Sequence, residues 1–208
     1  MAFAAANIDR RWKGWNFRFA GKTIVLSARP ITVPKGENMS YSQNLLPEFD
    51  EEMKNTRKIL DCVPDGKFNY QPHEKSMTLG RLATHVAELP SWATMTLDVE
   101  VLEMGPDFKP VVATTRSELL EIFDKGVAEA RAKILAASDA DWQKTWTFKF
   151  GGKTILSMPR SVVMRSTVMN HLIHHRAQLG VFLRLNNVQI PGMYGPSADE
   201  AKFWEAGA

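Results

Sequence analysis

The chain is almost free of cysteine, since Cys62 is the only one among its 208 residues. A single cysteine cannot form an internal disulfide, and its presence agrees with a reducing compartment. No neighbouring feature favours a reactive thiolate, so we expect Cys62 to pack as a small apolar side chain near a helix end. An intramolecular disulfide framework is therefore excluded.

Long apolar runs and concentrated charge are also missing. No apolar stretch approaches the roughly 20 residues that cross a bilayer, and residues 1–15 lack the uninterrupted apolar core of a secretory signal. The net charge is +3, and the Lys and Arg residues are scattered rather than gathered into a basic block or stripe. We therefore expect a cytoplasmic protein that binds neither nucleic acid nor a membrane.

Histidine is scarce as well, with five residues, yet His171, His174 and His175 lie close together. In a helix, His171 and His175 share one face at a separation of about 6 Å, so both can reach one ion. A third ligand must come from elsewhere. We expect it to be His85, which lies in an apolar helical run, rather than His73, which lies in a Pro-containing loop.

A histidine pair at this spacing is often merely hydrogen-bonded or exposed, so the spacing alone leaves metal binding and a structural role open. The surrounding pattern favours the metal, because one helical stripe turns the pair inward; its members are Met164, Thr167, His171, His175, Gln178 and Phe182. Buried imidazoles need polar partners, and a bound ion supplies them. His174 is rotated by about 100° from its neighbours, and we expect it at the surface or beside the ligands.

Apolar residues at helical spacing predict four long helices, at about 42–60, 76–102, 115–137 and 161–185. Ser76 and Thr115 are the expected N-caps of the second and third helices, and Glu118 completes a capping box with Thr115. Pro90 is expected to break or kink the second helix. The segment 190–197, which is rich in Gly and Pro, is expected to fold back across the bundle.

A β-hairpin is predicted between the third and fourth helices, and its sequence occurs twice. Residues 15–24 and 146–155 are identical at seven of ten positions. Two such hairpins can pair edge to edge, whereas the alternative is an unpacked N-terminal appendage. Because exposed strands with Trp and two Phe promote aggregation, we expect docking within the subunit or across a dimer. The chain is thus divided into an N-terminal extension, 1–40, and a helical-bundle domain, 41–208.

Two segments, SMTLGRLATHVAELP at 76–90 and NHLIHHRAQL at 170–179, resemble the DinB-like family of helical-bundle proteins. The tail PGMYGPSADE at 191–200 is similar to one that many members carry. This resemblance, over about residues 41–200, implies an all-α fold: a four-helix up-down-down-up bundle with one β-hairpin, or two paired hairpins, appended. It also implies a homodimer and a divalent metal, with zinc or nickel expected, held by three histidines. By motif position these are His85, His171 and His175.

Three histidines leave coordination positions open to water or substrate, as in a reactive site. A divalent ion lowers the pKa of bound water or thiol, so two reactions stay open: metal-dependent hydrolysis, and transfer that uses a low-molecular-weight thiol. Relatives in the broader superfamily include thiol-dependent isomerases and transferases, but a shared fold does not transfer function. The alternative is a non-catalytic, metal-stabilised bundle that serves ligand binding or a stress response. That alternative predicts a fourth protein ligand, from Glu88, His174 or Tyr194.

Two charged residues are candidates for catalysis. Glu88, one turn after His85, is a candidate general base or orienting group, with a surface carboxylate as the alternative. Arg176 directly follows a predicted ligand and is a candidate for binding an anionic substrate, although a structural salt bridge would explain it equally. Further candidates for the pocket wall, or for packing and hydrogen bonding, are Trp92, Gln178 and Tyr194.

Overall fold

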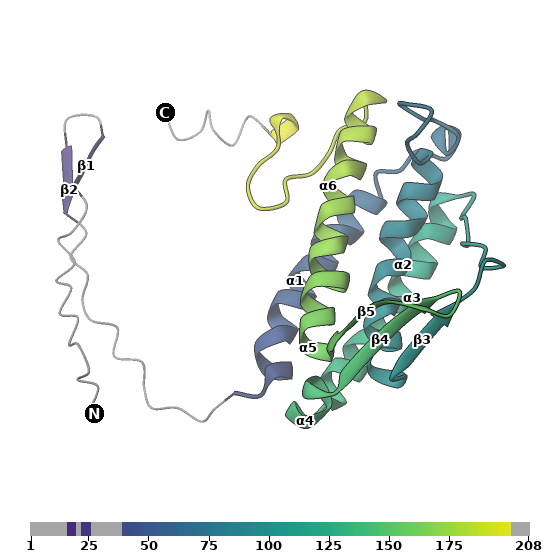
Figure 1. Cartoon of the computed structure of the whole chain (residues 1–208). Coiled ribbons are helices and arrows are strands. Elements are labelled where there is room, and N and C mark those ends of the chain that lie inside the picture. Colours follow the sequence, from purple (N-terminus) through teal and green to yellow (C-terminus); the bar gives the residue numbers. More distant parts are fainter. Residues whose placement is uncertain (1–15, 20–21, 26–38, 201–208) are drawn as a thin grey trace, which may run out of the picture. The chain divides into compact units, whose positions relative to one another are not determined.

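The computed structural model describes residues 16–19, 22–25 and 39–200 (Figure 1). The chain divides into two compact units, Met1–Asn38 and Met39–Ala208. In the first unit, β1 (Asn16–Phe19) and β2 (Lys22–Val25) pair antiparallel, so the first copy of the repeat forms the predicted hairpin. Its docking stays a prediction.

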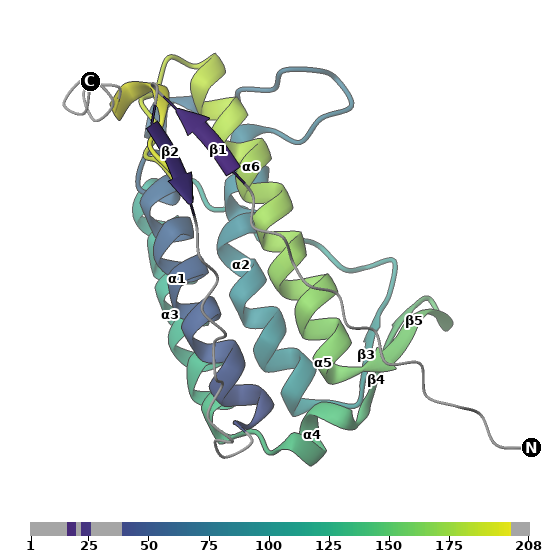
Figure 2. The ribbon, with the colours of Figure 1, turned by 90° about the vertical axis from the view of Figure 1, so that its left-hand side faces the viewer.

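Four long helices build the second unit (Figure 2), and the fourth of them is divided into three segments. Their bounds are α1 (Tyr41–Leu60), α2 (Leu79–Asp98), α3 (Arg116–Ala136), and α5 (Arg160–Val163) continued by η2 (Met164–Met169) and α6 (Asn170–Leu185). Shorter helical elements are η1 (Asp65–Lys67), α4 (Asp139–Gln143) and η3 (Ala198–Glu200). The helix α1 is antiparallel to α3. Asp50 forms an ion pair with Arg131, while Arg57, further along α1, forms one with Asp124, which lies earlier on α3. The helices α2 and α3 are parallel, because Ala113 bonds Thr84 while Lys133 pairs with Asp98, and the predicted up-down-down-up bundle is thus confirmed.

A single apolar core lies between these helices, as the helical periodicity predicts. Along α1, the apolar side chains of Leu45, Phe49, Met53 and Leu60 are buried. Such burial stabilises the fold by roughly 1.5–3 kcal/mol for each large apolar side chain. The core therefore fixes the helices from which the histidines project.

A three-stranded sheet lies at one end of the bundle, with strand order β3 (Val101–Met104), β4 (Thr145–Phe150), β5 (Lys153–Pro159). The predicted hairpin β4–β5 is confirmed, and its turn uses Gly151 and Gly152 at positive φ of 54° and 78°. Positive φ angles at both positions are typical of a two-residue hairpin turn. Residues other than Gly, Asn and Asp rarely adopt them. Strand β3, which pairs parallel with β4, was not predicted.

The predictions for α2 were wrong at both ends. Thr78, not Ser76, is the N-cap, since its side chain accepts a hydrogen bond from the backbone N–H of Arg81. The helix ends at Asp98 because the following residues extend along β4. Pro90 does not break α2, which continues through it against α3. There Gly126 allows close packing, because an added Cβ would lie 3.4 Å from the backbone nitrogen of Ser91.

The third helix begins as predicted, with Thr115 as N-cap, but its capping box is altered. The Glu118 carboxylate accepts a hydrogen bond from the backbone N–H of Thr114, one residue before the N-cap.

Among the residues described, no helix is long and apolar enough to cross a bilayer.

Candidate metal centre

Two helices bring the three predicted ligands together. His85 projects from α2, and His171 and His175 project from α6, which packs beside it (Figures 1 and 2). Their ring centroids lie 4.6 to 4.9 Å apart, and one ligand nitrogen of each lies within 4.8 Å of the others. His85 is buried, whereas the other two are half-buried. The cluster is thus buried at His85 and partly exposed at His171 and His175.

Each imidazole is oriented by an oxygen that accepts a hydrogen bond from its Nδ1. The acceptor is Oε1 of Glu88 for His85 at 2.8 Å, the Thr167 carbonyl for His171 at 3.2 Å, and Oε1 of Gln178 for His175 at 2.7 Å. A carboxylate or carbonyl oxygen can only accept, so Nδ1 carries the proton and Nε2 carries the lone pair in these rings.

The Nε2 atoms of His85 and His171 lie 3.2 Å apart. With both Nδ1 atoms protonated, two lone pairs face each other at this distance and repel unless a cation lies between them. Three neutral imidazoles, each held by an oxygen acceptor, are also the donor set of zinc and similar divalent ions. The residues present therefore fit the metal that the sequence predicts.

The same surroundings keep the rings of His171 and His175 neutral. Burial lowers the pKa of His171 to about 4, and repulsion from His85 and His175 adds to this effect. Burial also lowers the pKa of His175, against the opposing effect of the hydrogen bond that its ring donates to Gln178. A neutral ring at neutral pH is the form that binds a metal.

The segment η2 is a π-helix that ends two residues before His171, and its Thr167 supplies the carbonyl that orients that histidine. π-helical turns are rare and occur often at functional sites. The centroid of the Trp92 ring lies 5.5 Å from that of the His171 ring and 6.0 Å from that of the His85 ring. Trp92, which is half-buried, therefore contacts two of the three histidines.

A pocket of about 340 Å³ opens beside His175. Its walls are formed by Lys75, Ser76, Met77, Leu82, His175, Gln178, Val181 and Phe182. These residues include no Asp or Glu. A molecule bound there meets an apolar wall, one lysine and the edge of the histidine cluster.

The DinB family profile matches residues 38–206. The chain belongs to the DinB family. The Bacillus subtilis (strain 168) protein YrdA is 25% identical over 161 residues, covering 77% of this chain and 92% of YrdA. A solved DinB-like protein from Bacillus cereus ATCC 10987 has a TM-score of 0.57 and 26% identity, covering 72% of this chain and 95% of that one. A second, from Bacillus subtilis, has a TM-score of 0.55 at 13% identity, covers 72% and 97% of the two chains, and shows the shared fold alone.

In this DinB-family chain, Glu88 lies beside the histidines but faces the outer nitrogen of His85. Its Oε1 also accepts a hydrogen bond from Arg81 Nη2 at 3.1 Å. Glu88 therefore contacts the ring nitrogen of His85 that lies away from the cluster, and its part in catalysis stays a prediction. Arg81 was not singled out from the sequence, although its position four residues before His85 puts both on one helix face.

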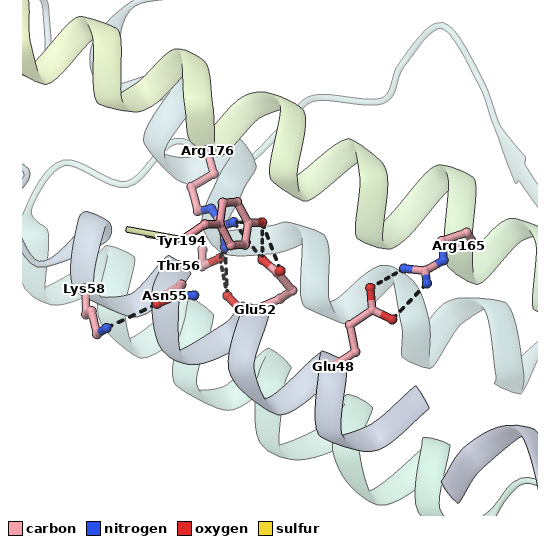
Figure 3. Close-up of polar contacts among 8 residues, drawn as sticks. All are labelled: Glu48, Glu52, Asn55, Thr56, Lys58, Arg165, Arg176 and Tyr194. Atoms are coloured by element: carbon pink, nitrogen blue, oxygen red, sulfur yellow. Dashed lines mark hydrogen bonds and ion pairs between the residues drawn. The ribbon is translucent and has the colours of Figure 1, made fainter. Parts of the chain in front are cut away.

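Arg176 lies in a different place, in a buried ion pair between α1 and α6 (Figure 3). Its Nη2 is 2.7 Å from Oε2 of Glu52, and its Nη1 donates to Thr56 Oγ1 at 3.1 Å. The Tyr194 hydroxyl completes the cluster by bonding Glu52 at 2.9 Å, so the tail folds back as predicted. This geometry is that of a structural salt bridge, which was one of the two alternatives for Arg176. A pocket of about 480 Å³ under the tail is lined by Arg176 and Tyr194 among mainly apolar residues.

The remaining candidates lie at the periphery. His174 is exposed, with its ring 4.9 Å from that of His175, and His73 is exposed in the loop before α2. Cys62 is half-buried, and burial raises the pKa of its thiol, which agrees with the packing function expected for it. None of these three belongs to the histidine cluster among the residues described.

The lowered pKa of His171 predicts a stability loss in acid. The unfolded ring has a pKa of about 6.5, while the folded one has a pKa of about 4. Between these values the unfolded state binds a proton that the folded state rejects, so stability present above about pH 6.5 is lost as pH falls toward 4. Urea unfolding of the metal-free protein across this range measures it. The loss should be shallower in His171→Gln and unchanged in His174→Gln; equal slopes in all three would contradict the assignment.

Proposed function

We propose that this chain is a metal-dependent enzyme that activates a low-molecular-weight thiol for transfer, with His85, His171 and His175 holding a divalent ion such as zinc. The observation that carries the proposal is the set of three oriented imidazoles whose Nε2 atoms face one another. A divalent ion at such a site lowers the pKa of a bound thiol or water toward neutrality. The histidines hold the ion, and their oxygen acceptors fix the rings.

The open side of the cluster supports a catalytic site over a closed, purely stabilising one. A closed site needs a fourth protein ligand. Two of the candidate ligands are engaged elsewhere, since Glu88 bonds the outer nitrogen of His85 and Tyr194 bonds Glu52. The third, His174, is exposed outside the cluster. A pocket beside His175 leads to the side that these residues leave open.

The surrounding groups favour thiol transfer over hydrolysis. Hydrolysis requires a nearby group that accepts a proton from water. The nearest described carboxylate, Glu88, already accepts hydrogen bonds from His85 and Arg81, and no carboxylate lines the pocket. A thiol needs less assistance, because its pKa starts near 8.5 rather than 15.7. We retain hydrolysis as the second candidate, because Glu88 lies beside the cluster.

The test is a pair of assays on protein loaded with zinc. We expect it to accelerate the reaction of 2-mercaptoethanol with 1-chloro-2,4-dinitrobenzene, in which a carbon–sulfur bond forms and chloride leaves. The metal-free protein and His171→Ala should not exceed the uncatalysed rate, whereas His174→Ala should match the wild type. Hydrolysis of 4-nitrophenyl acetate, followed in parallel, tests the second candidate. Metal-dependent hydrolysis without thiol transfer would overturn the proposal in favour of a hydrolase.

A further inference from the structure

The pocket of about 480 Å³ between α6 and the tail has a mainly apolar wall, and we call it the tail pocket. Val181 and Leu185 belong to this wall from α6, and they are 58% and 56% exposed. Pro191 and Met193 belong to it from the tail. Single exposed apolar residues are normal on a protein surface, but a group of them around a hollow indicates a binding surface.

The polar side chains that line the tail pocket already have partners. Arg184 pairs with Asp199 at 2.6 Å, and Arg176 pairs with Glu52 at 2.7 Å. The Tyr194 hydroxyl bonds Glu52 as well, at 2.9 Å. Because both arginines are neutralised by a carboxylate, the tail pocket favours an apolar occupant over a charged one.

The end of the tail is fixed against this pocket. The Glu200 carboxylate accepts hydrogen bonds from the backbone N–H of Gly192 at 3.2 Å and from that of Ser197 at 2.9 Å. A Cβ added to Gly192 would lie 2.7 Å from Oε2 of Glu200, so the two residues are in direct contact. Gly192 stands between Pro191 and Met193, which both line the pocket. The chain therefore leaves Glu200 beside the tail pocket.

The chain continues past Glu200 with the sequence AKFW at 201–204, which belongs to the same compact unit as the pocket. Phe203 and Trp204 are the only aromatic residues after Tyr194. An extended chain spans about 3.3–3.6 Å per residue, so Trp204 can lie up to about 14 Å from Glu200. Two large apolar side chains are thus tethered within reach of an apolar pocket.

We propose that the tail pocket is the docking site of the chain's own C-terminal segment, with Phe203 and Trp204 packed against Val181 and Leu185. Docking removes the apolar surface of both partners from water. The short connection to Glu200 keeps the effective concentration of the segment high, which favours it over a separate partner. Val181 also lines the pocket beside His175, so the docked segment borders the opening next to the histidine cluster.

Alkylation of an introduced thiol by iodoacetamide, in the full chain, tests this inference. Every variant carries Cys62→Ser, so that the introduced thiol is the only one. Val181→Cys places the thiol on the wall of the tail pocket. Val162→Cys is the matched control, because Val162 is 46% exposed on α5 and lies outside that pocket. Each variant is compared with and without the double substitution Phe203→Ser/Trp204→Ser.

We expect the double serine substitution to accelerate alkylation at position 181 by at least about tenfold, as the loss of one large buried apolar side chain allows. Alkylation at position 162 should not change. Equal rates at position 181 with and without the serines would overturn the inference, because the pocket is then open or covered by another molecule. Protection that disappears on hundredfold dilution would show that a second copy covers the pocket, and would overturn docking within the chain. Equal acceleration at both positions would contradict a local contact.

Discussion

Replacing Glu52 with alanine is expected to lower the free energy of unfolding by about 3–5 kcal/mol, as for other buried ion pairs that lose one partner. The side chains of Glu52 and Arg176 are only 9% and 3% exposed, so the variant leaves a guanidinium charge inside the protein without its counter-ion. The contacts of Arg176 with Thr56 and Tyr194 remain but carry no opposite charge. Urea unfolding at neutral pH measures the change.

A matched control lies one turn earlier on α1. Glu48 forms an ion pair with Arg165 (Figure 3), but those side chains are 39% and 49% exposed. Glu48→Ala should therefore cost no more than about 1 kcal/mol. The double variant Glu52→Ala/Arg176→Met should be more stable than Glu52→Ala, because it removes the stranded charge. If Glu52→Ala costs no more than Glu48→Ala, the cluster is not the structural element described above.

His171→Ala should abolish stoichiometric metal binding. Residues that only orient a metal ligand typically contribute about 10–100-fold to metal affinity, so removing a ligand should cost more than this. His171 is also the ligand whose Nε2 lies 3.2 Å from that of His85, at the centre of the cluster. Elemental analysis of untagged protein, expressed without added nickel, measures metal per chain.

His174→Ala is the matched control for that substitution, since His174 is exposed one position before His175 and outside the cluster. It should keep the wild-type metal content. Loss of metal in His174→Ala together with retention in His171→Ala would show that another set of ligands holds the ion. Both variants remove one histidine from α6, so a difference in their metal content reports the position of the histidine and not its mere loss.

The sequence predicted the parts of this molecule that depend on local spacing. The four-residue spacing of His171 and His175 places both on one helix face, and the apolar run around His85 indicated that it is buried. The structure brings these three together. The hairpin β4–β5 was likewise predictable, because its strands alternate and flank a Gly-Gly turn.

The features that were missed depend on contacts between distant segments. Strand β3 forms because β4, more than forty residues later, pairs with it in parallel; its own residues do not distinguish a strand from the end of α2. The hydrogen bond between Arg81 and Glu88 joins residues seven positions apart, and spacing alone does not reveal it. For Arg176 the sequence left two alternatives, and the ion pair with Glu52, which lies on another helix, could not be read from spacing.

X-ray absorption spectroscopy at the zinc edge, on zinc-loaded wild-type protein with and without mercaptoacetate, tests the central claim most directly. Three imidazole nitrogens and a further light ligand are predicted before the thiol is added. After addition, a sulfur neighbour should replace the light ligand at about 2.3 Å. A coordination shell that contains four protein ligands, or one that excludes the thiol, would contradict an open three-histidine centre.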